Sequence, residues 1–271
     1  MVFHSPGEKS IYVPKTYIVG GFFAHELTCS DIENRWNEEN TRVGVKRYHA
    51  SEVNARDGEF EGWPKEKQIE YSKNLLQILL DQDHLIHIVS VGMEATEYHQ
   101  AINEFGRKKL GTPYIACFKS CVSALAQQMD LTGSGFAPED KFAIILDRNE
   151  AEEADAVRVF YAMKDDSKWP HSHRLATCAP GSWEDFTSLQ CADLIAYETF
   201  RLVHNQHTAP RVRKALELMF DRNAFLGYTY DRETLLNLKQ PLESEIWCVD
   251  NGFVVNFPPV LEPMDSREKR L

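Results

Sequence analysis

Long apolar runs and a secretory signal are both missing from this chain of 271 residues. Its longest apolar run, residues 142–146, has the length of a strand, whereas a membrane-spanning helix needs about 20 apolar residues. The first residues lack a basic segment followed by an apolar stretch, which is the pattern of a secretory signal. The sequence therefore predicts no membrane association and a cytoplasmic location.

Cysteine is sparse, and positive charge is in the minority. Six cysteines are spread over the whole chain, which argues against a small disulfide-stapled fold. Cys117 and Cys121 lie four residues apart in a helical pattern, and we interpret them as buried thiols, with part of a metal site as the alternative. The chain has 41 Asp and Glu against 30 Lys and Arg, a net charge of −11. This balance argues against nucleic-acid binding through bulk charge alone, but not through a local basic groove or a bridging metal ion.

The remaining composition, with 43% hydrophobic residues, is that of a globular protein, and strand and helix patterns alternate along it. Strand patterns cover 16–24, 84–91, 142–146 and 174–178, and helical patterns begin at Ser30, Pro64 and Thr112 and cover about 150–163 and 188–203. Strands separated by helices favour an α/β fold with a mixed sheet. The tail after Pro210 is predicted to be mostly helical, with strand-like runs at 246–249 and 253–255.

Two local patterns make more specific predictions. Ser30 followed by Glu33 forms a capping box, which predicts that the first helix begins at Ser30. Gly20 and Gly21 lie inside the first strand, where glycine indicates a bulge or the close approach of another backbone.

The segment 187–200 holds the most informative carboxylate. Thr187 and Gln190 fit a capping box, so this helix is predicted to begin at Ser188. Its apolar face, at spacings of three and four, comprises Leu189, Ala192, Ala196, Phe200 and Val203. Asp193 falls inside this face and beyond the first turn, where a buried carboxylate is costly unless it is paired, hydrogen-bonded or bound to a metal. Asp193 is therefore a candidate functional carboxylate, with a buried ion pair to Arg or Lys as the alternative.

Three further candidates lie near element ends. Asp147 directly follows the strand pattern 142–146, at the end where ligands bind in open α/β sheets. The alternative is that it caps the next helix together with Glu150. His49 and Glu52 would share one side of a helical turn and could act as metal ligand, base or water-orienting group. The alternative for His49 is an ordinary surface histidine.

Carboxylates of Asp147, Asp193 and Glu52 that converged in one cleft would repel each other unless a divalent cation neutralised them. Such oxygen ligands suit Mg²⁺ or Mn²⁺, and two such ions can activate water and stabilise a leaving oxygen in phosphodiester cleavage. The sequence therefore predicts a metal site built from these three carboxylates, with His49 in a catalytic role. A bridging metal ion would also supply local positive charge for a phosphate, which the net charge of −11 does not provide.

Four motifs follow one another along the chain: Gly20-Gly21 at the first apolar strand, His49-Ala50-Ser51, Asp147 after an apolar strand, and residues 190–197 (QCADLIAY). In this combination they resemble the Domain of Unknown Function 3800 family of bacteria and phages, over roughly residues 16–201. The resemblance implies an RNase H-like fold, with a mixed central sheet flanked by helices, and a metal-dependent nuclease or a relative of transposase catalytic domains. It also implies that Asp147 and Asp193 occupy the family's two later acidic positions and that His49, with Glu52 nearby, occupies its middle motif.

The chain departs from the family at its start. The family opens with a strand ending in Asp-Glu-Ser-Gly, whose Asp would be the central metal ligand, whereas residues 3–8 here read Phe-His-Ser-Pro-Gly-Glu. Only a Gly, with His4 or Glu8, could stand in, so we expect either a natural start upstream of Met1 or loss of the first strand. The predicted domains are 1–207, RNase H-like with a truncated first strand, and 208–271, a mostly helical C-terminal extension packed on it.

Two functional hypotheses follow. The first is a Mg²⁺- or Mn²⁺-dependent nuclease that cuts DNA or RNA, with a basic contact surface at residues 107–109 or at Arg211, Arg213 and Lys214. The alternative for these clusters is a solvated helix face. The second is a catalytically inactive RNase H-like module that binds a nucleic-acid or protein partner, or a second copy of itself, for instance in phage defence or a mobile element. A Ser or Cys hydrolase is disfavoured, because the chain has no Gly-x-Ser-x-Gly elbow.

Overall fold

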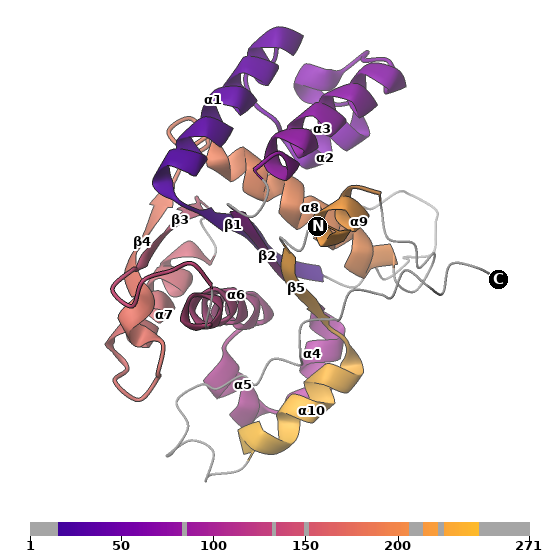
Figure 1. Cartoon of the computed structure of the whole chain (residues 1–271). Helices are drawn as coiled ribbons and strands as arrows, with labels where there is room; N and C mark the ends of the chain where they lie inside the picture. Colours follow the sequence, from indigo (N-terminus) through magenta and orange to yellow (C-terminus); the bar gives the residue numbers. More distant parts are fainter. Residues whose placement is uncertain are drawn as a thin grey trace, which may run out of the picture.

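The computed structural model describes residues 16–82, 86–131, 134–148, 152–205, 214–221 and 225–243. The strands are β1 (Thr16–Ala24), β2 (Ile86–Glu94), β3 (Phe142–Asp147), β4 (Leu175–Gly181) and β5 (Phe225–Tyr230). The helices are α1 (Glu26–Val43), α2 (Ala50–Ala55), α3 (Lys65–Leu80), α4 (Ala95–Ala101), α5 (Glu104–Leu110), α6 (Pro113–Asp130), α7 (Glu153–Asp165), α8 (Ser188–Asn205), α9 (Lys214–Asp221) and α10 (Arg232–Glu243), with two 3-10 turns, η1 (Gly58–Phe60) and η3 (Ser172–Arg174). The mixed α/β architecture predicted from the sequence is confirmed (Figure 1). None of the helices in these ranges has both the length and the apolar character needed to cross a membrane.

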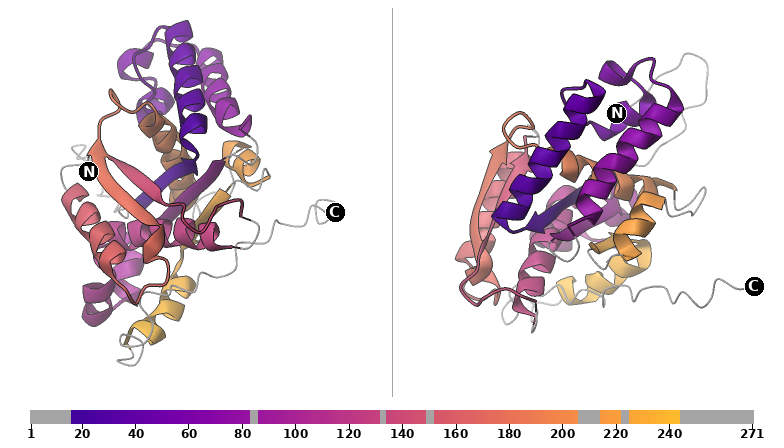
Figure 2. Two further views of the ribbon diagram at one scale, coloured as in Figure 1. Left: turned by 60° about the vertical axis from the view of Figure 1, so that its left-hand side comes forward. Right: turned by 45° about the horizontal axis from the view of Figure 1, so that its top comes forward.

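The described strands form two sheets instead of the single central sheet that was expected. In the larger sheet, β1 pairs antiparallel with β2, and β2 pairs parallel with β5. The smaller sheet is the parallel pair β3 and β4. The two sheets lie next to each other (Figures 1 and 2), and Phe23 of β1 packs edge-on against Phe142 of β3, with 5.9 Å between ring centroids.

Strand β2 lies at the centre of the larger sheet and separates two apolar clusters. Ile86 and Ile88 belong to the cluster formed with α1, α3 and α8, whereas Val89, Val91 and Met93 belong to the cluster formed with α6. Because side chains along a strand alternate between the two faces of its sheet, α8 and α6 must cover opposite faces, as Figure 1 shows. This arrangement explains why β2 carries apolar residues on both of its faces.

The glycine pair in β1 allows α8 to lie directly on the sheet. A Cβ atom at Gly20 would come within 3.0 Å of the Ala196 Cα atom, and one at Gly21 within 3.8 Å of the Ala192 Cβ atom. The close backbone approach predicted for this pair is therefore confirmed at Gly20, whereas Gly21 makes an ordinary contact with the Ala192 side chain. Because α8 also carries Asp193, this contact fixes the position of that carboxylate relative to the strands.

The start of the first helix differs from the prediction. Helix α1 begins at Glu26, and His25 occupies its N-cap position, where the side chain accepts a backbone N–H of the first turn. Ser30 instead donates to the Glu26 carbonyl within the helix, at 3.1 Å. Glu33 does not complete a capping box, because its carboxylate accepts the backbone N–H of Ser188 at 3.0 Å and so caps α8.

The C-terminal region contributes a strand to the larger sheet. Within 208–271 the described residues are mostly helical, as predicted, but β5 lies between α9 and α10 and pairs with β2. The sequence Phe-Leu-Gly-Tyr-Thr-Tyr of β5 has the aromatic and β-branched composition of a strand, so the signal was present and was missed. The strand-like runs 246–249 and 253–255 lie outside the described residues, as do residues 84–85 at the start of the second predicted strand.

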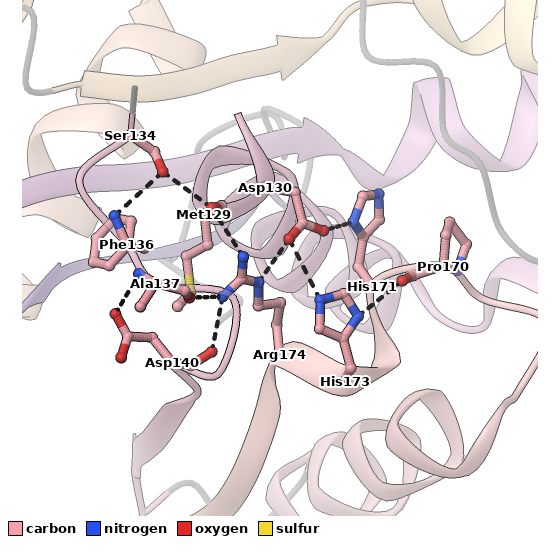
Figure 3. A network of polar contacts seen from close by, with 10 residues as sticks. All are labelled: Met129, Asp130, Ser134, Phe136, Ala137, Asp140, Pro170, His171, His173 and Arg174. Atoms are coloured by element: carbon pink, nitrogen blue, oxygen red, sulfur yellow. Dashed lines mark hydrogen bonds and ion pairs between the residues drawn. The ribbon is translucent and has the colours of Figure 1, made fainter. Parts of the chain in front are cut away.

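A buried arginine joins the segments that precede β3 and β4 (Figure 3). The Arg174 side chain is 5% exposed, and its Nε donates to the Asp130 carboxylate at 2.6 Å. Its other two nitrogens donate to the carbonyls of Met129 at 3.2 Å, Asp140 at 3.1 Å and Ala137. The end of α6, the loop before β3 and the turn before β4 therefore share one cation.

Two histidines complete this network around Asp130. His171 contacts one carboxylate oxygen through Nδ1, and His173 Nε2 lies 3.4 Å from the other. Burial raises the pKa of the Asp130 carboxyl, but the hydrogen bonds from His171 and Arg174 outweigh burial and lower this pKa below its ordinary value. Asp130 is therefore held in its ionised form beside Arg174.

Candidate active site

Asp193 lies on α8 in partly buried surroundings. Its Oδ2 atom accepts the backbone N–H of Ala50 at 2.7 Å. Burial raises the pKa of the Asp193 carboxyl above its ordinary value, and the negative charge of Asp147 raises it further. The hydrogen bond from Ala50 and the nearby side chains of His49 and Arg47 oppose this rise without cancelling it. Asp147 and Asp193 are therefore close enough for their charges to interact, although 46 positions separate them in the sequence.

Asp147 reaches the site from the carboxyl end of a strand, as predicted. It is the last residue of β3 and pairs in register with Gly181, the last residue of β4. Parallel strands present these ends at the same edge of a sheet, where ligands bind in α/β proteins. The alternative role as a helix cap does not hold, because α7 begins at Glu153 with Glu152 in its N-cap position.

His49 and Glu52 share one side of a helical turn, as their spacing predicted. His49 is the N-cap residue of α2, and its Nδ1 atom lies 3.1 Å from Oε1 of Glu52. The same carboxylate oxygen accepts a hydrogen bond from the Arg47 guanidinium at 2.9 Å. The hydroxyl of Ser51 also lies 3.4 Å from Nδ1 of His49, as a hydrogen-bond partner. Glu52 therefore orients His49 and Arg47, and its Oε1 is already occupied.

Gln190 has a structural role that the sequence did not reveal. Its Oε1 atom accepts hydrogen bonds from the backbone N–H of Tyr48 at 2.7 Å, from Trp36 at 3.2 Å and from Asn40 at 3.1 Å. The predicted capping box with Thr187 is wrong, because the Gln190 side chain points into this buried network. The predicted helix start at Ser188 is nevertheless confirmed.

Two side chains of α8 hold the backbone on both sides of His49. Gln190 accepts the N–H of Tyr48, and Asp193 accepts the N–H of Ala50. The spacing of three places both acceptors on the same side of the helix. The motif 190–197 and the motif 49–51 therefore form one unit that presents His49 next to the carboxylates.

Replacing Gln190 by Ala is expected to destabilise the protein by about 2–3 kcal/mol, because three buried donors lose their acceptor. The segment that carries His49 also loses one of its two backbone anchors. Denaturant unfolding measures the first effect. The exposed Gln100 on α4 gives the matched control, Gln100→Ala, which changes stability by about 0.5 kcal/mol or less. An unfolding free energy for Gln190→Ala equal to that of the control would contradict this role.

The five cysteines in the described ranges have the properties of structural thiols. Burial raises the pKa of all five thiols in the described ranges, so they remain protonated near neutral pH: Cys29, Cys117, Cys121, Cys178 and Cys191. Cys117 and Cys121 donate to the carbonyls of Tyr17 and Val19 in β1. The interpretation of this pair as buried thiols is confirmed.

The two aspartates suit a magnesium ion only in part. Among the described residues, no group of three or more His, Cys, Asp or Glu side chains is arranged to hold a metal ion. Asp147 and Asp193 nevertheless supply two carboxylates, and Mg²⁺ is commonly bound through one or two protein carboxylates together with waters and phosphate oxygens. Glu52, predicted as a further ligand, is instead engaged by Arg47 and His49.

The described residues of the predicted basic clusters have partners within the protein, and Arg107 donates to the carbonyls of His99 and Ile102 before its helix. Lys108 pairs with Glu104 at 3.2 Å, and the Lys109 ammonium lies 4.0 Å from the centre of the Phe105 ring. Lys214 pairs with Glu217 at 3.5 Å. Arg211 and Arg213 lie outside the described residues.

No protein-family model matches this chain, and no curated protein or solved structure is significantly similar to it. The function of the site must therefore be inferred from its own geometry and chemistry.

Proposed function

We propose that this protein is a divalent-metal-dependent nuclease with an RNase H-like fold, related to the Domain of Unknown Function 3800 family. The observation that carries the proposal is the placement of two carboxylates near each other, Asp147 at the end of β3 and Asp193 on α8, which contacts β3. Burial raises the pKa of Asp193, and the negative charge of Asp147 adds to this rise. A bound cation relieves this repulsion. Charge repulsion of this kind is typical of active sites, where it persists because function requires it.

The contacts between the four motifs of the resemblance support the family assignment. Gly20 and Gly21 pack against the helix of motif 190–197. That helix binds the backbone next to His49, and its Asp193 interacts with Asp147. The antiparallel β1–β2 pair and the parallel β3–β4 pair have the two strand relations of a mixed sheet, although they lie in two neighbouring sheets.

Each residue of the site has a chemical role in phosphodiester hydrolysis. Asp147 and Asp193 would hold Mg²⁺ or Mn²⁺, which supplies a Lewis acid that activates water and stabilises charge on the phosphate. Nε2 of His49 accepts a proton from the attacking water, and the carboxylate of Glu52, 3.1 Å from Nδ1, stabilises the positive charge that the ring then carries. The water oxygen bonds to phosphorus, the bond to the leaving sugar oxygen breaks, and solvent protonates that oxygen.

The proposal is tested with labelled single-stranded and double-stranded DNA and RNA, incubated with Mg²⁺, Mn²⁺ or EDTA. We expect cleavage with either ion and none with EDTA. Replacing Asp147 by Asn is expected to lower the rate by about 100-fold or more, because one of the two carboxylates is lost. The matched control is Glu184→Gln, which removes an exposed carboxylate from the loop after β4 and leaves the rate unchanged. Cleavage that persists in EDTA, or an Asp147→Asn protein as active as the control, would refute the proposal.

A second candidate function is a catalytically inactive module that binds a nucleic-acid or protein partner. The observation in its favour is that the described residues bring together only two carboxylates. Calorimetric titration with Mn²⁺ separates the two candidates. Saturable uptake that is lost in Asp147→Asn supports the nuclease, whereas the absence of uptake and cleavage, with intact binding of a partner, supports the module.

A further inference from the structure

The site has an aromatic and cationic edge that neither the motifs nor the proposed mechanism use. We propose that Arg47 and Trp183 form the substrate-binding edge of this site and select single-stranded nucleic acid. Arg47 contacts a phosphate of the bound strand, and the ring of Trp183 stacks on an unpaired base next to it. This inference rests on the proposed function, because it concerns the substrate of the same site.

Trp183 lies next to the carboxylates through the strand register. Gly181 ends β4 directly opposite Asp147 of β3, and its carbonyl accepts the backbone N–H of Arg148 at 3.1 Å. Trp183 follows only two residues later, and its side chain is partly exposed. An aromatic ring is therefore presented to solvent at the edge of the sheet where Asp147 ends its strand.

Hydrogen bonds brace the loop that carries Trp183. The Ser182 carbonyl accepts the backbone N–H groups of Asp185 at 3.1 Å and Phe186 at 2.9 Å, and the Ser182 hydroxyl donates to the Asp185 carboxylate at 3.0 Å. The loop then enters α8, whose first N–H is capped by Glu33. Because these hydrogen bonds already order the loop, little further conformational entropy is lost when a base stacks on the Trp183 ring.

Arg47 supplies positive charge at the same place. Its guanidinium carbon lies 5.2 Å from the centre of the Trp183 ring, and one of its nitrogens binds Glu52 at 2.9 Å. The side chain is 30% exposed and lies close enough to Asp193 to lower the pKa of that carboxyl. A guanidinium held by a carboxylate and an aromatic face keeps further donors for a phosphate oxygen.

The chemistry of the pair points to single strands. A base can stack on a protein ring only when it is not stacked and paired within a duplex, and binding of single strands depends on this combination of aromatic rings and backbone cations. A chain with a net charge of −11 cannot attract a nucleic acid through bulk charge. Local contacts such as this pair must therefore supply the affinity.

The test uses the full chain with Asp193→Asn, so that binding is measured without cleavage. A fluorescein-labelled single-stranded oligonucleotide and the duplex of the same sequence are titrated by fluorescence anisotropy, as DNA and as RNA. Adding Trp183→Ala is expected to weaken single-strand binding about 10-fold and to leave duplex binding unchanged, whereas Trp183→Phe retains most of the affinity. Tyr161→Ala is the matched control, because Tyr161 is an exposed ring beside Lys164 on α7, outside the site.

Kinetics with the otherwise wild-type protein distinguish this inference from the proposed function. Trp183→Ala is expected to raise KM for single strands about 10-fold with little change in kcat, and Arg47→Ala to raise KM as well. Cleavage with an unchanged KM in both variants overturns the inference and leaves the proposed function intact. Single-strand binding that depends on Trp183, in a protein that cuts no substrate, supports the inference and overturns the proposed function. Equal losses for single strands and duplexes overturn the selectivity.

Discussion

An Asp193→Asn protein is expected to lose metal-dependent cleavage by about 1,000-fold or more and to remain folded. Metal ions stabilise transition-state charge by several kcal/mol, and each step of about 1.4 kcal/mol corresponds to a factor of ten in rate. The asparagine still offers an oxygen to the N–H of Ala50, so the loop that carries His49 keeps its anchor. Rate assays in Mg²⁺ and in Mn²⁺ measure the loss.

The same substitution is expected to stabilise the protein without metal. Because the pKa of Asp193 is raised in the folded state, the stability associated with this group is fully present below the unfolded-state pKa of about 3.9. It is lost as the pH rises through the raised folded-state pKa. The melting temperature of Asp193→Asn should therefore exceed that of the wild type at neutral pH by about 2–4 °C, or about 1 kcal/mol. The difference should shrink as the pH falls toward 4.

Metal supplies the decisive control for this prediction. Mg²⁺ or Mn²⁺ should raise the melting temperature of the wild-type protein and have little effect on Asp193→Asn, because binding to the folded state stabilises it. Glu184→Gln should behave like the wild type. An Asp193→Asn protein that cuts normally would show that the Asp193 carboxylate is not needed for metal-dependent cleavage. An Asp193→Asn protein that melts at a lower temperature than the wild type at neutral pH would show that the ionised carboxylate does not destabilise the fold.

Replacing Arg174 by Ala is expected to have the largest effect on stability, a loss of about 3–5 kcal/mol. Asp130 loses its buried guanidinium partner and keeps the contacts with His171 and His173, and three backbone carbonyls lose their donors as well. The free energy of unfolding, measured in urea, reports the loss. Lowered activity would accompany it only through unfolding, because Arg174 precedes β4 whereas the candidate site lies at its carboxyl end.

The matched control is Arg158→Ala on α7. Arg158 also pairs with an aspartate, Asp155, but both side chains are exposed, and exposed pairs contribute about 0–1 kcal/mol. Equal destabilisation by the two substitutions would show that burial does not set the energy of the Asp130–Arg174 pair. Substituting Arg174 by Lys restores one charged contact but not the fork of donors, so it should recover only part of the loss.

Local patterns predicted most of the secondary structure. Strand β3 and helix α8 were predicted with near-correct bounds, and α6 with its correct start, because their apolar residues recur with the period of the element. The candidate residues came from the same kind of reasoning. Asp193 was unusual on an apolar helix face, Asp147 followed a strand, and His49 and Glu52 had the spacing of one helical turn. Each of these signals lies within a short window of sequence.

Partners distant in sequence could not be predicted in this way. Glu33 had the spacing of a capping box for its own helix, yet it caps α8, 155 positions later. Gln190 likewise binds the backbone of Tyr48, 142 positions earlier. A polar side chain near a helix start can accept a free backbone N–H of its own helix or of another helix, with similar local geometry. Only the packing of the helices decides which of the two it caps.

The sequence by itself determined where carboxylates, histidine and glycine stand relative to the helices and strands, because helix and strand periodicities depend only on neighbouring residues. Only the tertiary structure decided that Asp147 approaches Asp193, that Glu52 is occupied by Arg47 and His49, and that β5 joins β2. These pairings depend on which surfaces bury each other when the chain folds, and many distant residues contribute to that choice together.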